Sequence, residues 1–172
     1  MLLNDDPAID SRKEEANEMN KRYIILLILF LLICGTIGGY LIYDRHTNKG
    51  DVSHAVIDYG FSKLYTIDDM DSAINTIKSE FSKWQGCELH TLAYTSDECN
   101  NERQIEWLNG IAKAKGYKVV LEQVIEFTSD FHSSKERRWD NEGFNLDFEY
   151  TNWKWYLGRT HGGSWILLSY GY

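Results

Sequence analysis

Asp130 and His132 are the residues whose types and spacing come closest to a catalytic pair. They stand two positions apart near the end of a predicted strand, so their side chains point to the same side. In a pocket, an aspartate that orients a histidine allows the imidazole to act as a general base. A single Asp-x-His is a short motif, and solvated loops contain it far more often than active sites do. The sequence therefore offers a catalytic role for this pair, with a plain loop role as the more common explanation.

Trp153, Trp155 and Trp165 could form a ligand-binding surface. Exposed tryptophans on a sheet can bind sugars or peptides, because the ring is large, flat and has one polar atom. On two facing strands, however, alternate tryptophans more commonly pack together as cross-strand pairs. We expect the three to belong to the core, and a binding groove is the alternative.

Neither the histidines nor the cysteines have the spacing of a metal site, since the sequence has no HxxxH pair and no CxxC. We predict no metal and no cofactor. Cys87 and Cys99 could form a disulfide if their domain is exported. A strand over residues 87–94 would carry the chain about 23 Å away from Cys87, at roughly 3.3 Å per residue. We therefore expect both thiols to stay free.

Two amphipathic helices are predicted to hold these side chains in place. Thr66 and Asp69 form a capping box, and apolar residues follow it at spacings of three and four. A similar box beginning at Thr95 predicts a second helix, which Gly116 ends. Both helices have one apolar face, so we expect them to cover a sheet.

The sheet is predicted from runs rich in β-branched and aromatic residues, over residues 87–94, 117–127, 144–159 and 164–170. The last two runs predict an antiparallel hairpin. Within 144–159 the apolar residues change parity, and a bulge or bend near Thr151 and Asn152 would return them to one face. The polar residues 129–143 predict an exposed loop between the two long strands.

Residues 23–43 form an apolar run without a charged side chain. As a helix, this run of 21 residues spans roughly 31 Å, about the thickness of the hydrocarbon core of a bilayer. Four basic residues lie on its N-terminal side, against Arg45 and Lys49 on the other, which favours a cytoplasmic N-terminus. We predict an uncleaved signal anchor in the cell membrane, with a cleaved signal peptide as the alternative.

The anchor divides the chain into a mobile cytoplasmic tail (1–22), a single transmembrane helix (23–43), a juxtamembrane linker (44–55) and an extracytoplasmic α+β domain (56–172). Gly35 and Gly39 form a GxxxG pair, and such a small-residue face can bring two helices together as a homodimer. The same pair also arises easily by chance, because glycine is common in membrane helices.

The charge of the chain argues against nucleic acid as a partner. The 172 residues carry 26 acidic and 18 basic side chains, which gives a net charge of −8. The chain therefore lacks the excess of positive charge expected of a protein that binds nucleic acid. Residues 44–172 alone carry a net charge of −6, so anionic polymers and anionic lipids would be repelled.

The chain resembles a family of small bacterial exported or membrane-anchored proteins that share a domain of unknown function. The resemblance covers roughly residues 56–172 and rests on Ile67-Asp68-Asp69, Ala73-Ile74, Gly86-Cys87, Asn152-Trp153-Lys154-Trp155, Gly162-Gly163-x-Trp165 and Gly171-Tyr172. It implies a host of the Gram-positive type and supplies no activity. The order of elements is also similar to the nuclear-transport-factor-like or cystatin-like fold, which implies a curved antiparallel sheet wrapped around a helix as a cone.

Three functions stay open at this point. The first is a non-enzymatic, membrane-anchored module whose outer domain binds a protein, a peptide or a small ligand. The second is a small-pocket hydrolase or isomerase that uses Asp130 and His132. The third is a structural subunit that assembles with another membrane protein through the helix. A polar cavity on the concave face of the sheet would favour the enzyme, and an exposed apolar surface or sheet edge would favour the binding module.

Overall fold

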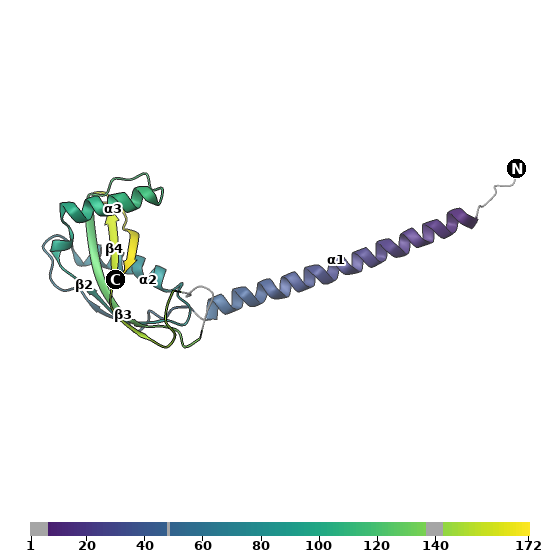
Figure 1. Ribbon diagram of the computed structural model, residues 1–172, viewed down its shortest axis with the longest axis horizontal. Coiled ribbons are helices and arrows are strands. Elements are labelled where there is room, and N and C mark those ends of the chain that lie inside the picture. The colour runs from purple at the N-terminus through teal and green to yellow at the C-terminus, as the bar shows by residue number, and fades with distance from the viewer. Residues whose placement is uncertain (1–6, 48, 137–142) are drawn as a thin grey trace. The chain divides into compact units, whose positions relative to one another are not determined.

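The computed structural model describes residues 7–47, 49–136 and 143–172, and gives side chains for 20–43, 49–136 and 143–172. Two compact units divide the chain, Met1–Thr47 and Asn48–Tyr172. The first unit contains one long helix, α1, and the second is an α+β domain with a curved sheet (Figure 1).

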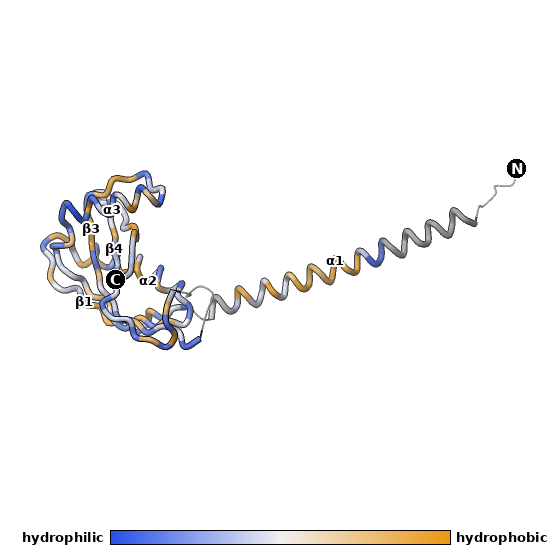
Figure 2. Tube along the Cα trace, viewed as in Figure 1, coloured by the Kyte–Doolittle hydropathy of each residue, from blue (hydrophilic) through white to orange (hydrophobic). Residues whose placement is uncertain are grey.

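Helix α1, Pro7–Thr47, contains the predicted apolar run. Its segment Asn20–Tyr43 is long and apolar enough to cross a membrane, and a signal sequence has the same features. Figure 2 shows the apolar stretch along the middle of this helix. Residues 7–22, predicted as a mobile tail, are helical, whereas residues 1–6 lie outside the described part. Pro7 suits a first helical position, and the Ala, Glu, Lys and Arg residues that follow are good helix formers.

The predicted linker 44–55 is much shorter in the structure. Helix α1 runs to Thr47, and the Gly50 amide already donates to the Ser82 carbonyl at 3.1 Å. Asp51 forms an isolated parallel bridge with Glu88. The domain therefore begins about six residues earlier than the apolar pattern alone predicts, because backbone hydrogen bonds hold this segment and Val52 and Ala55 pack against the core.

The domain contains a five-stranded sheet of β1 Val56–Asp58, β2 Glu88–Tyr94, β3 Gln123–His132, β4 Glu149–Arg159 and β5 Ile166–Gly171, arranged in that order. The pairs β2–β3, β3–β4 and β4–β5 are antiparallel, which confirms the C-terminal hairpin. Strand β1 lies parallel to β2, so the sheet is mixed and not purely antiparallel. Helix α2 makes this possible, because a parallel pair needs a crossover connection.

Helix α2, Ile67–Phe81, has the predicted capping box: the Thr66 side chain accepts from the Asp69 amide, and the Asp69 side chain accepts from the Thr66 amide. Its apolar stripe packs on one face of the sheet against residues such as Ile125, Phe127 and Trp155. Because successive residues of a strand point to opposite faces, Val124 faces the other way, and it packs beneath α3.

The second helix begins later than predicted. The Ser96 side chain accepts from the Glu98 amide and starts a short 3-10 turn, η1 Asp97–Cys99. Helix α3, Glu102–Ala114, has its own N-cap, Asn101, whose side chain accepts from the Gln104 amide. Two caps in succession separate what the sequence predicts as one helix start. Figure 1 shows α3 across one end of the sheet.

Residues 117–122 do not form the start of a strand. The Asn109 side chain accepts from the Leu121 amide at 2.8 Å and donates to the Leu121 carbonyl at 3.1 Å. These bonds satisfy the backbone that a neighbouring strand would otherwise pair. Strand β3 is displaced towards the C-terminus as a result, and it includes residues 129–132 of the predicted exposed loop.

The first part of the predicted strand 144–159 is a loop to which Ser133 makes several hydrogen bonds. The Ser133 hydroxyl donates to the Asn145 carbonyl at 2.6 Å and accepts from the Phe148 amide at 3.0 Å. Further along, Ser129 pairs with Trp153 and Phe131 with Tyr150, so Asp130 alone faces two residues of β4. This confirms the bulge at Thr151 and Asn152.

Candidate functional site

Asp130 has a structural partner in the bulge. Its carboxylate accepts from the amide of Asn152 at 2.9 Å, and Asn152 has a φ of 56°. A left-handed residue is uncommon outside glycine, and asparagine tolerates it better than most. Asp130 therefore fixes the extra residue of β4 in place, a role that needs no reaction.

His132 lies on the same face as Asp130, but its carboxylate partner is another residue. The His132 Nε2 atom is 3.5 Å from the Asp147 Oδ1 atom. On the same face, His90 Nδ1 is 2.9 Å from Glu149 Oε1. Within the described residues no hydrogen bond joins Asp130 to His132, and no cluster of three His, Cys, Asp or Glu side chains could hold a metal. Asp130 and His132 therefore contact different residues: Asp130 contacts Asn152 in the bulge, and His132 contacts Asp147.

The concave face of the sheet is filled by its own side chains. Phe81, Phe127, Phe131 and Trp155 are completely buried between α2 and the strands. Trp84 stacks on Trp155 with ring centroids 5.1 Å apart. Aromatic rings thus occupy the space in which a cone-shaped fold would hold a substrate.

The three candidate tryptophans have different environments. Trp155 is buried and donates through Nε1 to the Ser129 hydroxyl at 2.8 Å. Trp165 directly precedes β5 and is buried beside Arg159, the last residue of β4. Its Nε1 atom donates to the Asp69 carbonyl at 3.0 Å. Trp153 is only half-buried, although its Nε1 atom is enclosed and has no hydrogen-bond partner in the described part of the chain. Two of the three therefore belong to the core, and Trp153 alone approaches the surface.

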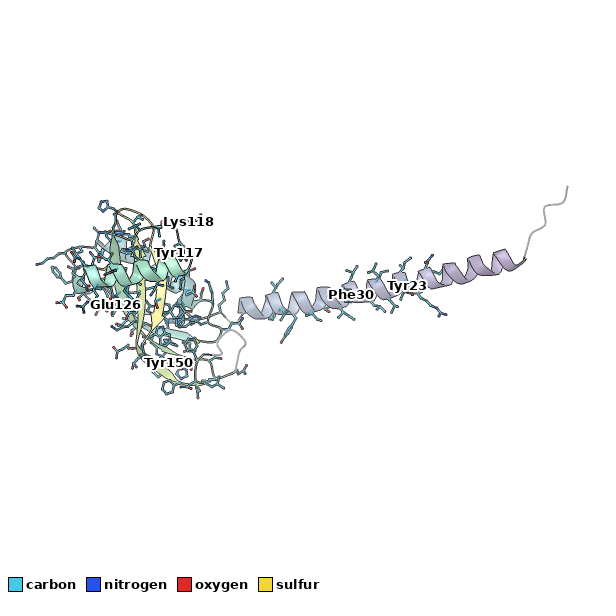
Figure 3. All side chains as sticks on the ribbon, turned by 45° about the horizontal axis from the view of Figure 1, so that its top comes forward. Tyr23, Phe30, Tyr117, Lys118, Glu126 and Tyr150 are labelled. Atoms are coloured by element: carbon cyan, nitrogen blue, oxygen red, sulfur yellow. The ribbon has the colours of Figure 1, made fainter. Side chains whose placement is uncertain are left out.

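Trp153 belongs to a group of rings that we call the aromatic end: Phe144, Phe148, Tyr150, Trp153, Tyr170 and Tyr172. The rings contact one another in an edge-to-face or tilted manner, as in the pairs Trp153–Tyr172 at 5.3 Å and Phe148–Tyr150 at 5.1 Å. Their exposed fractions reach 47% for Phe148, 43% for Tyr170 and 79% for Tyr172. Figure 3 shows Tyr150 at the end of the domain away from Tyr117, which follows α3.

Tyr170 is partly exposed, and its surroundings disfavour ionisation of its hydroxyl. Partial burial raises the pKa of its hydroxyl, and the carboxylate of Glu80 raises it further. Tyr170 therefore presents a neutral phenol at physiological pH.

The two edges of the sheet differ in a way that bears on binding. Strand β1 has three residues, ends at Asp58 and is too short to offer a long row of free backbone groups. Strand β5 has six residues, and no Asp, Glu, Lys or Arg occurs anywhere in residues 160–172. Natural edge strands are usually protected by charges, prolines or bulges. In β5 the only such device in the described structure is a bulge, which leaves Leu168 as the extra residue.

The remaining candidates lie elsewhere. Cys87 and Cys99 are buried and form no disulfide in the described structure, and burial raises the pKa of the Cys99 thiol to about 11. Gly35 and Gly39 have open space where a Cβ would stand. Their association with a second helix stays a prediction.

The strand β5 edge and the aromatic end were missed as a site by reasoning from tryptophans alone. A usable signal was present in the sequence, namely the absence of charge throughout residues 160–172.

No protein-family model, no curated protein and no solved structure matches this chain.

Proposed function

We propose that this chain is a single-pass membrane protein whose extracytoplasmic domain is a non-catalytic binding module for an extended polypeptide segment. The observation that carries the proposal is the edge of β5, an uncharged strand of six residues at the border of the sheet. An extended peptide can add a strand to such an edge, with main-chain hydrogen bonds for affinity and side-chain pockets for specificity.

The chemistry of the partner follows from the surroundings of β5. A polypeptide backbone offers alternating donors and acceptors that match those of an edge strand. The net charge of −6 over residues 44–172 favours a segment that is neutral or basic. We also propose that the curved sheet and α2 correspond to the cone of the nuclear-transport-factor-like or cystatin-like fold. The three antiparallel pairs beside α2 support this correspondence, and the parallel β1 departs from it.

The test uses the full chain in lipid nanodiscs and a displayed library of unstructured peptides as the probe. We expect enriched peptides to slow hydrogen exchange at the backbone amides of β5. Ser169→Lys adds a charge on this edge strand and should abolish binding. Ser79→Lys adds the same charge at an exposed position of α2 and is the matched control. Enriched peptides that protect amides elsewhere, or that bind Ser169→Lys equally well, would contradict the proposal.

A further inference from the structure

The chain enters the domain at the same end of the sheet that carries the aromatic rings. The Gly50 amide donates to the Ser82 carbonyl just after α2. Gly50 lies so close to this turn that an added Cβ would stand 2.9 Å from the Trp84 carbonyl oxygen. The Trp84 ring in turn lies 4.9 Å from the ring of Phe144 and 5.3 Å from that of Tyr170.

Chain length limits how far Gly50 can lie from the apolar segment of α1. Four helical residues follow Tyr43 and add about 6 Å, at about 1.5 Å each. Three peptide steps from Thr47 to Gly50 reach at most about 11 Å. If Asn20–Tyr43 spans a bilayer, Gly50 therefore stays within about 17 Å of the end of that span, whatever the orientation of the domain.

The aromatic end has the composition of a membrane-interface surface. Tyrosine and tryptophan concentrate at the headgroup level of bilayers, where one part of the ring is in an apolar environment and the other is hydrated. Tyr170, Tyr172 and Trp153 offer such rings beside Phe148, and Tyr172 is the most exposed of them.

Charge decides which lipid this surface fits. Described carboxylates near this end of the sheet include Asp51, Glu80, Glu88, Glu136, Asp147 and Glu149, and described lysines near it include Lys49, Lys83 and Lys135. The acidic groups are in excess, so an anionic headgroup would be repelled. A zwitterionic surface accepts the rings without this repulsion.

We infer that the aromatic end docks in the headgroup region of a zwitterionic bilayer and holds the domain against the membrane surface. Burial of rings drives this contact, so it does not depend on salt in the way that contacts to anionic lipids do. Tyr170 belongs both to β5 and to the aromatic end, but docking uses its ring whereas peptide addition uses the backbone of β5, so the two proposals can fail separately.

The experiment reads tryptophan emission from the full chain in liposomes. All six tryptophans lie between residues 84 and 165, so none is in the apolar helix. Trp139 lies outside the described residues and is replaced by Phe in every protein of the series. We expect phosphatidylcholine brominated near its headgroup to quench the emission, compared with the same lipid without bromine. High salt should leave this quenching unchanged.

Matched variants locate the contact. Trp153→Phe should remove most of the quenchable emission, whereas Trp107→Phe should leave it, because Trp107 is exposed on α3 at the other end of the sheet. Tyr172→Ser should reduce quenching of Trp153 severalfold. Val120→Ser, at a residue that is 73% exposed beyond α3, should not.

Three outcomes would overturn the inference: no quenching by the brominated lipid, quenching that follows Trp107, or full quenching in Tyr172→Ser. Cross-linking between copies at Tyr172 without lipid quenching would assign the aromatic end to a protein contact instead. Unchanged denaturation midpoints for Tyr172→Ser and Val120→Ser would show that the variants remain folded.

Discussion

The two ends of the sheet are closed by different kinds of interaction. At one end, which we call the polar end, Arg159 Nη1 contacts Asp69 Oδ1 at 2.6 Å, and the Arg159 guanidinium lies 4.2 Å from the centre of the Trp165 ring. Asp97 accepts from the hydroxyls of Ser62 and Tyr94 nearby. Directional bonds fix each of these side chains in one geometry.

The aromatic end is closed by ring packing, and it leaves part of each outer ring exposed. Its ring-to-ring contacts are weakly directional, although the Tyr150 hydroxyl accepts from the Asn145 amide at 2.8 Å, and the Trp153 Nε1 atom is enclosed without a hydrogen-bond partner in the described structure. A surface of this kind can exchange its contact with water for contact with another molecule. The comparison therefore places directional polar contacts at the polar end, and packed rings with exposed edges at the aromatic end, where we propose that binding occurs.

The largest effect is expected at the base of the aromatic end. Trp84→Ala removes a buried ring that stacks on Trp155 and touches Phe131 and Phe144. We expect the free energy of unfolding to fall by about 3–5 kcal/mol. Chemical denaturation of the full chain in detergent, followed by Trp fluorescence, measures the change.

The control for this change is Trp107→Ala. Trp107 is 43% exposed and has one described ring contact, with Tyr156 at 5.0 Å. We expect it to lower the free energy of unfolding by roughly 1 kcal/mol. Equal losses in the two variants would show that the aromatic end is not a packed part of the core.

A smaller but pH-dependent effect is expected at the polar end. Partial burial raises the pKa of Asp69, but the hydrogen bonds from Arg159 and Thr66 outweigh it and lower the pKa below its ordinary value of 3.8. Arg159→Met removes the cation and leaves the carboxylate with fewer partners. At neutral pH we expect a loss of about 2 kcal/mol in the free energy of unfolding.

The sign of the pH dependence follows from the lowered pKa of Asp69. A carboxyl whose pKa is lower in the folded state contributes stability above its unfolded value, and this contribution is lost as the pH falls through the folded pKa. The difference between wild type and Arg159→Met should therefore shrink as the pH falls below about 4. Midpoints measured over an acid series check this, and a constant difference would refute the role of the ion pair.

The helices and the C-terminal hairpin could be predicted because local signals agree with the final contacts. Thr66 and Asp69 cap each other across three residues, and the parity change in 144–159 needs a bulge wherever the strand pairs. Residues 117–122 were wrongly predicted as the start of a strand, because the bonds that hold Leu121 come from Asn109 of α3. A side chain from another element decided that segment, and no local pattern shows it.

The candidate site was less predictable for a similar reason. Asp130 and His132 share a face as expected, but their partners Asn152 and Asp147 come from β4 and the loop before it. The uncharged C-terminal segment was visible in the sequence, whereas its position at the edge of the sheet depends on the strand order. Composition thus indicated an unusual strand, and only the topology showed that β5 is the last strand of the sheet.

A moderate effect is expected where the bulge connects β3 to β4. Asp130→Ala removes the acceptor for the Asn152 amide, so we expect a loss of about 1–2 kcal/mol in the free energy of unfolding. Asn152→Gly should be neutral or slightly stabilising, because glycine adopts a positive φ without steric cost. Denaturation midpoints compare the two variants. An unchanged midpoint for Asp130→Ala would show that its bond to the Asn152 amide does not stabilise the fold, and Asp130 would again be a candidate for catalysis.

The smallest effect is expected at Trp153, and it separates the two kinds of tryptophan most directly. Trp155→Phe leaves the buried Ser129 hydroxyl without its donor, so it should lower the free energy of unfolding by about 1–3 kcal/mol. Trp153→Phe removes an Nε1 atom that has no partner in the described structure, so only ring area is lost and we expect less than about 1 kcal/mol. Denaturation of both variants under one condition gives the comparison. A loss at Trp153 as large as that at Trp155 would mean that a polar group does engage Trp153, and the aromatic end would then be held by directional bonds like the polar end.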